Sequence, residues 1–272
     1  MWFLYLLIIL AVIAVFLVLA IMPRKRRDTA PFDRTLYAHR GLHDNEGGTP
    51  ENSLAAFAAA AQAGYGVELD VQLTADGHIV VFHDNDLSRM CGIDKRVDEL
   101  TYSELKAFPL LDTDQHIPLL SEVLEVLDGA TLLCEFKAMH SYTDTTLCDE
   151  ALPLLENYKG AVCIESFNPF MVQWFRTHAP HYVRGILAKK FVKGEVAQML
   201  RFPLSSLLTN WLCRPDFIAY QHTDHSQLFF RLCRLFHPMT VAWTVKSEAE
   251  AKASQLHFDT IIFEGFLPEN TH

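Results

Sequence analysis

The chain has 272 residues, half of them hydrophobic, and a formal net charge of −10, which is enough for one large domain with a sizeable core. Four of the 23 basic residues stand together at positions 24–27, so the rest of the chain is still more acidic. This balance excludes a typical nucleic-acid-binding protein, and an anionic substrate would need a metal ion or a few placed cations. The six cysteines lack zinc-type or disulfide-framework spacing, which favours a reducing compartment.

Residues 1–22 are apolar and carry no side-chain charge, a length that matches the hydrocarbon thickness of a bilayer. We interpret them as a transmembrane anchor, followed by a basic linker at residues 23–33. A cleaved signal peptide is the alternative, but its basic residues would precede a shorter apolar run. Because the basic residues follow the run, they predict a single-pass membrane protein with its catalytic domain in the cytoplasm.

Residues 34–272 alternate between strand-like and helix-like segments. Asn52 is a candidate N-cap for the helix that Gly64 closes, and Asn168 with Pro169 begins a later helix. Residues 85–116 are predicted to be an irregular, polar insertion over the site. Counting one arm of a hairpin gives eight strands, beginning at Leu36, Val67, Leu132, Val162, Val183, Phe217, Val241 and Thr260.

Eight parallel strands with covering helices predict an α/β protein, a (β/α)8 TIM barrel with a small hairpin and insertion over its mouth. An open doubly wound sheet is the alternative, but the glycine-rich loop expected after its first strand is missing.

The hairpin at residues 67–84 carries the first candidate site. Glu68 and Asp70 alternate with period two, so both project from one face of a strand. A turn at 75–77 folds the chain back and brings His83 beside Asp70. A surface hairpin with solvated polar residues is the alternative for this segment taken alone.

Active-site residues of a TIM barrel lie at the C-terminal ends of its strands. Three carboxylates from two strands there suit a hard cation, Ca²⁺ or Mg²⁺, rather than zinc. The remaining strand ends leave alternatives: Lys137 could simply pair with Glu135, Ser166 could cap a helix, and Trp243 could be core. The polar and aromatic residues at predicted strand ends are His39, Arg40, Glu68, Asp70, Glu135, Lys137, Ser166, Phe167, Trp243 and Glu264.

Taken together in order, these motifs resemble the glycerophosphodiester phosphodiesterase family over roughly residues 35–265. Singly the motifs are weak, but as an ordered set they are specific. They are HRG at 39–41, PENS at 50–53, ELDV at 68–71, TADG at 74–77, VVFHD at 80–84, IPLL at 117–120, EFK at 135–137, SFNP at 166–169 and WTV at 243–245.

The resemblance implies a role for each matching residue. Glu68, Asp70 and Glu135 would hold the divalent metal, His39 and His83 would be the general acid and base in either assignment, and Arg40 and Lys137 would bind the phosphate. Glu51 would act behind these residues or at the helix entry, and Ser166, Phe167 and Trp243 could form a substrate wall. The chain departs from the family at Phe263-Glu264, where a Thr-Asp pair is usual.

The function implied is metal-dependent hydrolysis of small glycerophosphodiesters to glycerol 3-phosphate and an alcohol. One alternative is a lysophospholipase D-like or phosphoinositide-cleaving enzyme, with the apolar stretch 191–212 guiding acyl chains. Another is an inactive, membrane-tethered binding barrel, against which the intact set of histidines and carboxylates argues. The head group, the metal and the oligomeric state are not determined by the sequence.

Overall fold

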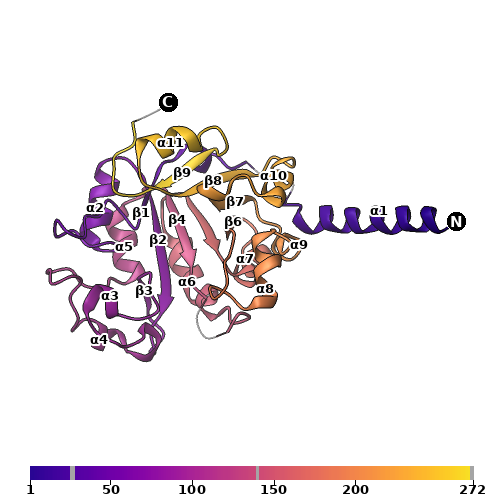
Figure 1. Cartoon of the computed structure of the whole chain (residues 1–272). Coiled ribbons are helices and arrows are strands. Elements are labelled where there is room, and N and C mark those ends of the chain that lie inside the picture. The colour runs from indigo at the N-terminus through magenta and orange to yellow at the C-terminus, as the bar shows by residue number, and fades with distance from the viewer. Residues whose placement is uncertain (25–27, 139–140, 270–272) are drawn as a thin grey trace.

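Eight parallel strands close into a barrel in the computed structural model, which describes residues 1–24, 28–138 and 141–269. The strand β1 pairs in parallel with both β2 and β9, and this closes the sheet. The predicted TIM barrel is therefore confirmed (Figure 1). Its parallel strands are β1 (Tyr37–His39), β2 (Gly66–Leu73), β4 (Leu132–Phe136), β5 (Val162–Ser166), β6 (Val183–Ala188), β7 (Phe217–Gln221), β8 (Met239–Val245) and β9 (Thr260–Phe263).

Helices cover the outside of the barrel, as the alternation of the sequence predicts (Figure 1). One apolar core lies between the sheet and these helices, and a second fills the barrel interior with side chains such as Tyr37, Leu133 and Phe217. The covering helices are α2 (Leu54–Gln62), α5 (Leu120–Leu127), α6 (Thr146–Asn157), α7 (Pro169–His178), α8 (Gln198–Ser205), α9 (Asn210–Cys213), α10 (Leu228–Arg234) and α11 (Glu248–Ser254).

The N-cap of α2 is Ser53, whose side chain accepts a hydrogen bond from the amide of Ala56. The expectation that Asn52 caps this helix is wrong by one residue, because both side chains suit the role and Asn52 is drawn to the barrel instead. The other expected cap is confirmed: Asn168 accepts from the amide of Phe170, with Pro169 at the first helical position.

The strand β3 (Ile79–Val81) runs antiparallel to β2 and forms the predicted hairpin. The amide of Phe82 donates to the carbonyl of Asp70, so His83 follows directly beside Asp70, as the sequence predicts.

Residues 85–116 are more ordered than the sequence predicts. They contain α3 (Ser88–Cys91), a 3-10 helix (Val97–Glu99) and α4 (Tyr102–Leu105), packed around their own apolar core. Figure 1 shows this segment beyond the C-terminal end of β2, as expected. The prediction of an irregular polar loop is wrong because the apolar residues here follow neither a helical nor a strand period.

The helix α1 (Trp2–Ile21) extends away from the barrel (Figure 1). It is long and apolar enough to cross a membrane, and only 11% of its most apolar window is buried. The three basic residues 25–27 of the expected linker lie outside the described residues.

Candidate active site

Three carboxylates meet inside the barrel near the C-terminal ends of two adjacent strands. Glu68 and Asp70 alternate along β2, and Asp70 lies in register with Glu135 on β4. All three are buried, and one oxygen of each lies within 4.8 Å of the others. Burial and mutual repulsion raise the pKa of Glu68 and of Glu135. Burial likewise raises the pKa of Asp70, but nearby positive charge, above all Lys137, lowers it below its usual range.

The donor chemistry of this trio fits a hard divalent cation. Only oxygen ligands are offered, from buried carboxylates that repel one another, and a cation between them would relieve the repulsion. In the structure the ammonium group of Lys137 supplies part of that positive charge. Its nitrogen lies 2.7 Å from oxygens of both Asp70 and Glu135. The pairing of Lys137 with Glu135 that the sequence allows is therefore present, and Asp70 shares it.

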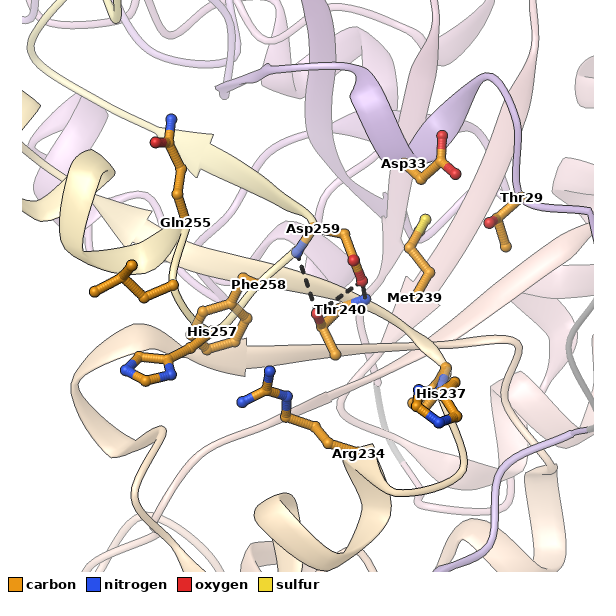
Figure 2. Close-up of a pocket in the computed structure, with 12 residues that line it drawn as sticks. Thr29, Asp33, Arg234, His237, Met239, Thr240, Gln255, His257, Phe258 and Asp259 are labelled. Atoms are coloured by element: carbon orange, nitrogen blue, oxygen red, sulfur yellow. Dashed lines mark hydrogen bonds between the residues drawn. The ribbon is translucent and has the colours of Figure 1, made fainter. Parts of the chain in front are cut away.

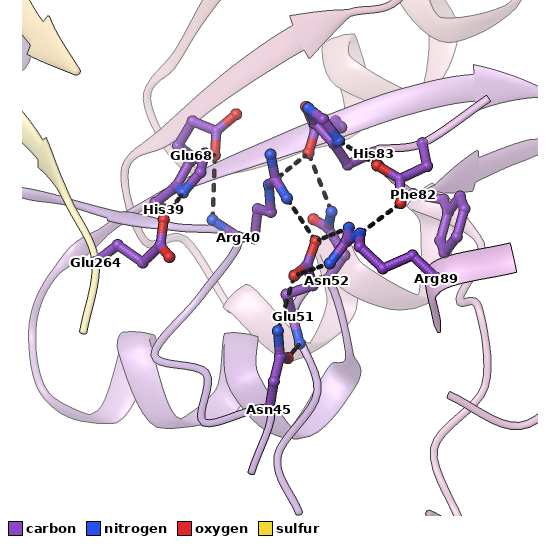
Figure 3. Close-up of polar contacts among 12 residues, drawn as sticks. His39, Arg40, Asn45, Glu51, Asn52, Glu68, Phe82, His83, Arg89 and Glu264 are labelled. Atoms are coloured by element: carbon purple, nitrogen blue, oxygen red, sulfur yellow. Dashed lines mark hydrogen bonds and ion pairs between the residues drawn. The ribbon is translucent and has the colours of Figure 1, made fainter. Parts of the chain in front are cut away.

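His39 lies at the end of β1 with a carboxylate on each side of its ring. Its Nδ1 is 2.7 Å from Oε2 of Glu264, and its Nε2 is 3.9 Å from Oε2 of Glu68 (Figure 3). Burial lowers the pKa of His39 to about 4, and the hydrogen bond to Glu264 opposes this. The imidazole is therefore neutral near pH 7, with Nδ1–H donated to Glu264 and Nε2 able to accept a proton.

His83 has the same kind of partner on the opposite side of the mouth. Its Nδ1 is 2.7 Å from Oδ1 of Asp84, and Nε of Arg89 donates to the other Asp84 oxygen at 2.7 Å. Burial raises the pKa of Asp84, but the bonds from His83 and Arg89 outweigh it and bring this pKa to about 2. Both histidines therefore have Nδ1 bound to a carboxylate.

Arg40 is held in a strained backbone conformation, with φ at +56°. Its guanidinium contacts Glu51 and lies 3.4 Å from Asp70. Glu51 also accepts two hydrogen bonds from Arg89, at 2.7 and 2.8 Å (Figure 3). Glu51 thus lies behind Arg40, the first of the two positions that the sequence allows for it. Asn52 adds a further contact, since its amide nitrogen donates to Asp70 at 3.0 Å.

Several of these partners are absent from the predicted site. Asp84 stands next to His83 in the sequence and could have been found there. Glu264 is among the residues at predicted strand ends, but its pairing with His39 is not predicted. Arg89 gives no sequence signal because the insertion folds it back onto Glu51. Glu165 on β5 is buried in register with Glu135, and burial and the neighbouring carboxylates raise its pKa well above the usual range.

A cavity of about 590 Å³ opens beside His83, Glu135 and Lys137. Phe167 lines it and packs edge-on against Trp243, with 5.5 Å between ring centroids. Ser166 also borders the cavity, but its hydroxyl donates to the carbonyl of Phe136 and accepts from the amide of Asn168. The hydroxyl of Ser166 therefore supports the start of α7, which is the helix role that the sequence also allows for it.

A second cleft, of about 280 Å³, lies at the opposite end of the barrel (Figure 2). Thr240 and Asp259 stand at its centre, and Asp259 accepts hydrogen bonds from the amide and the hydroxyl of Thr240. Both residues are at the N-terminal ends of their strands or just before them. Residues at that face of a TIM barrel serve stability, so we assign the cleft no part in the chemistry.

Comparison with known proteins agrees with this geometry. Residues 39–264 match the model of the glycerophosphoryl diester phosphodiesterase family. A glycerophosphodiester phosphodiesterase of Caldanaerobacter subterraneus subsp. tengcongensis is 34% identical over 160 residues, which cover 55% of this chain and 65% of that protein. The chain thus spans slightly less than two thirds of this relative's length. A lysophospholipase D of Rattus norvegicus is 32% identical over 135 residues, 45% of this chain and 41% of that protein.

Among solved structures, an Oleispira antarctica phosphodiesterase in complex with the product sn-glycerol-3-phosphate is similar with a TM-score of 0.69. The match covers 84% of this chain and 92% of that one, at 23% sequence identity. At this identity the likeness supports the barrel fold alone.

Proposed function

The chain belongs to the glycerophosphoryl diester phosphodiesterase family, and from this we propose that it hydrolyses glycerophosphodiesters to glycerol 3-phosphate and an alcohol. The observation that carries the proposal is the pair of histidines, His39 and His83, that flank a buried carboxylate trio with Nδ1 of each on a carboxylate. This arrangement leaves Nε2 of both rings free to exchange protons with a substrate at the mouth.

The proton transfers would be divided between the two histidines. One Nε2 accepts the proton of the nucleophile, which is water or the adjacent hydroxyl of the substrate. The other histidine begins the reaction as an imidazolium and donates its Nε2 proton to the leaving alkoxide. Glu264 and Asp84 hold the two rings in one tautomer and stabilise each imidazolium as it forms.

The phosphate would be bound by Arg40 and Lys137. Both lie at the mouth, where their charged groups contact Asp70. A phosphodiester gains negative charge in its transition state, and these two cations stabilise it there. Glu68, Asp70 and Glu135 would hold a divalent cation, Ca²⁺ or Mg²⁺. When bound, this ion supplies Lewis-acid stabilisation of the phosphoryl oxygens.

Lysophospholipids are a second candidate substrate class. The aromatic contact between Phe167 and Trp243 beside the cavity offers an apolar wall to the alcohol side of the substrate. The similarity to a lysophospholipase D favours the same class. We also propose that α1 crosses the membrane and that residues 34–272, the catalytic domain, lie in the cytoplasm.

The test uses the full chain purified in detergent and assayed with glycerophosphocholine and with lysophosphatidylcholine, with and without chelator. Glycerophosphocholine should yield glycerol 3-phosphate, and lysophosphatidylcholine should yield a lysophosphatidic acid. Chelation of the metal should abolish the formation of either product. The Glu68→Gln variant should fold, because a residue at the mouth is not part of the apolar core. It should be nearly inactive, because one of the three proposed metal-binding carboxylates is lost. Full activity of this variant in chelator would exclude the metal-dependent reaction.

A second test concerns the two histidines. His39→Ala and His83→Ala should each lower the turnover rate by about 10²- to 10⁴-fold, the usual range for a positioned proton-transfer group. Groups that act as a unit are not additive, so the double variant should be little worse than the worse single variant. Multiplicative losses would mean that the two histidines act independently.

A further inference from the structure

Three consecutive helices expose large apolar side chains on the side of the barrel from which α1 projects. Among the described residues that follow α1, nine such side chains are exposed, and most belong to α8, α9 and α10 or the residue that follows them. We call the following set the apolar face: Met199, Phe202, Trp211, Leu228, Leu232 and Leu235. Their exposed fractions run from 36% to 82%, which is far from the burial such residues usually have.

The C-terminal end of α1 is fixed at the centre of this face. The Asn210 side chain on α9 donates to the carbonyl of Ile21 at 2.8 Å, and the thiol of Cys233 on α10 lies 3.4 Å from the same oxygen. Arg214 donates to the carbonyl of Met22 at 2.7 Å. Ile21 is 1% exposed, whereas most of α1 is free of contacts. The helix therefore leaves the barrel through a built junction and not through a loose tether.

The charge of these helices also differs from that of the whole chain. The helices α8, α9 and α10 contain three basic residues, Arg201, Arg231 and Arg234, and no acidic residue, although the chain has a net charge of −10. Apolar side chains interspersed with arginine suit the boundary between lipid headgroups and acyl chains, where arginine meets lipid phosphate.

We propose that the apolar face lies in the headgroup region of the same bilayer that α1 crosses, so that the barrel rests on the membrane. The inference rests on the membrane-spanning role proposed above for α1. Figure 1 places α8, α9 and α10 around the point where α1 leaves the barrel, which is where a bilayer around α1 would begin.

The orientation has a consequence for the substrate. The segment that joins β6 to α8 carries Phe191, whose ring lies 5.9 Å from that of Phe167 at the mouth cavity. The amide of Phe191 also donates to the hydroxyl of Ser205 on α8, so this segment links the mouth to a helix of the apolar face. An amphiphilic phosphodiester could then reach the mouth from the membrane surface.

Trp211 provides a direct probe of the face, because it is 58% exposed on α9. The full chain carrying Trp2→Phe would be placed, one copy per nanodisc, in phosphatidylcholine with phosphatidylglycerol. Its fluorescence is compared with and without phosphatidylcholine brominated near the glycerol end of the acyl chains. The brominated lipid should quench this chain, and adding Trp211→Phe should remove the quenching.

The matched control moves the probe to the far side of the barrel. Trp2→Phe, Trp211→Phe and Glu125→Trp together place an exposed tryptophan on α5, and this chain should not be quenched by the brominated lipid. Equal quenching at positions 211 and 125, or none at 211, would overturn the proposal. If the face is instead covered by a second copy of the chain or by another protein, that partner is missing from a nanodisc with one copy. Trp211 then faces water and is not quenched.

The failures of the two proposals are distinguishable. In the chain with Trp211→Phe alone, Trp2 reports whether α1 enters the bilayer. Quenching of Trp2 without quenching of Trp211 rejects only the apolar face, whereas no quenching of either rejects the membrane span as well. Hydrolysis of glycerophosphocholine by the same samples tests the catalytic proposal separately.

Discussion

At the scale of single residues, the Glu264 carboxylate sets which ring nitrogen of His39 is available to the substrate. Its Oε2 lies 2.7 Å from Nδ1 of His39, and its Oε1 lies 3.2 Å from the ammonium nitrogen of Lys246. The hydrogen bond from His39 is the main reason that the pKa of Glu264 falls to about 2. A carboxylate held in its charged form at Nδ1 keeps Nε2 as the nitrogen available to the substrate.

Glu264→Gln should therefore lower the turnover rate by about 10²- to 10⁴-fold, because an amide can hold the imidazole in the wrong tautomer and stabilises the imidazolium poorly. Steady-state kinetics with a soluble glycerophosphodiester would measure this, and KM should change much less than kcat.

The control for this variant is Lys246→Gln, which removes the second contact of Glu264 but leaves the carboxylate on His39. Lys246 is largely exposed, so its loss should cost little activity. Equal losses in both variants would show that the position of Glu264 matters and its charge does not.

At the scale of one helix, two adjacent residues at the entry to α2 have separate tasks. Ser53 caps the helix, and its replacement by alanine should lower the free energy of unfolding by about 1 kcal/mol with activity retained. Asn52 has φ at +56° and donates to Asp70, so Asn52→Gly keeps the backbone conformation and removes only the side chain.

Asn52→Gly should lower metal affinity and activity more than Ser53→Ala does, because the Asp70 carboxylate loses the hydrogen bond that holds it in place. Denaturant unfolding and metal titration of the two variants separate the effects. An Asn52→Gly variant with unchanged metal affinity would assign this residue to the turn alone.

The same elements explain what could be predicted from the sequence. Period-two alternation placed Glu68 and Asp70 on one face of their strand, and the strand order of a barrel placed Glu135 on the neighbouring strand. The small core of residues 85–116 and the contact between Arg89 and Glu51 depend on packing between segments without a repeating pattern. Such packing is tertiary, and no local period indicates it.

At the scale of the whole molecule, burial of His39 makes stability depend on pH. Its pKa falls from 6.5 to about 4, so the unfolded chain takes up a proton at pH values where the folded chain does not. This contribution to stability is fully present above pH 6.5 and is lost as the pH falls toward 4. In chelator, His39→Gln should therefore show a smaller fall in Tm between these pH values than the unmodified chain. An equal fall in Tm in the two chains would show that groups other than His39 cause the loss of stability in acid.

The last prediction concerns the side of the membrane on which the barrel lies. The amide of Arg24 donates to the carbonyl of Pro215 at 2.9 Å, and its guanidinium lies 3.6 Å from buried Asp216. The barrel therefore begins at the basic residues, and with α1 crossing the membrane as proposed, the two share one side of it. Positive residues beside a membrane span stay in the cytoplasm.

Protease added to intact cells should leave the barrel uncut, and permeabilised cells should lose it. Replacing the basic residues at 25–27 by glutamine and adding lysines before Trp2 should weaken this protection, because the charge difference across α1 is then reversed. Arg24 is kept in that variant, so its contacts with the barrel are not disturbed. Digestion of the unmodified chain in intact cells would place the barrel outside, where the enzyme would meet extracellular phosphodiesters in place of those released by lipid turnover within the cell.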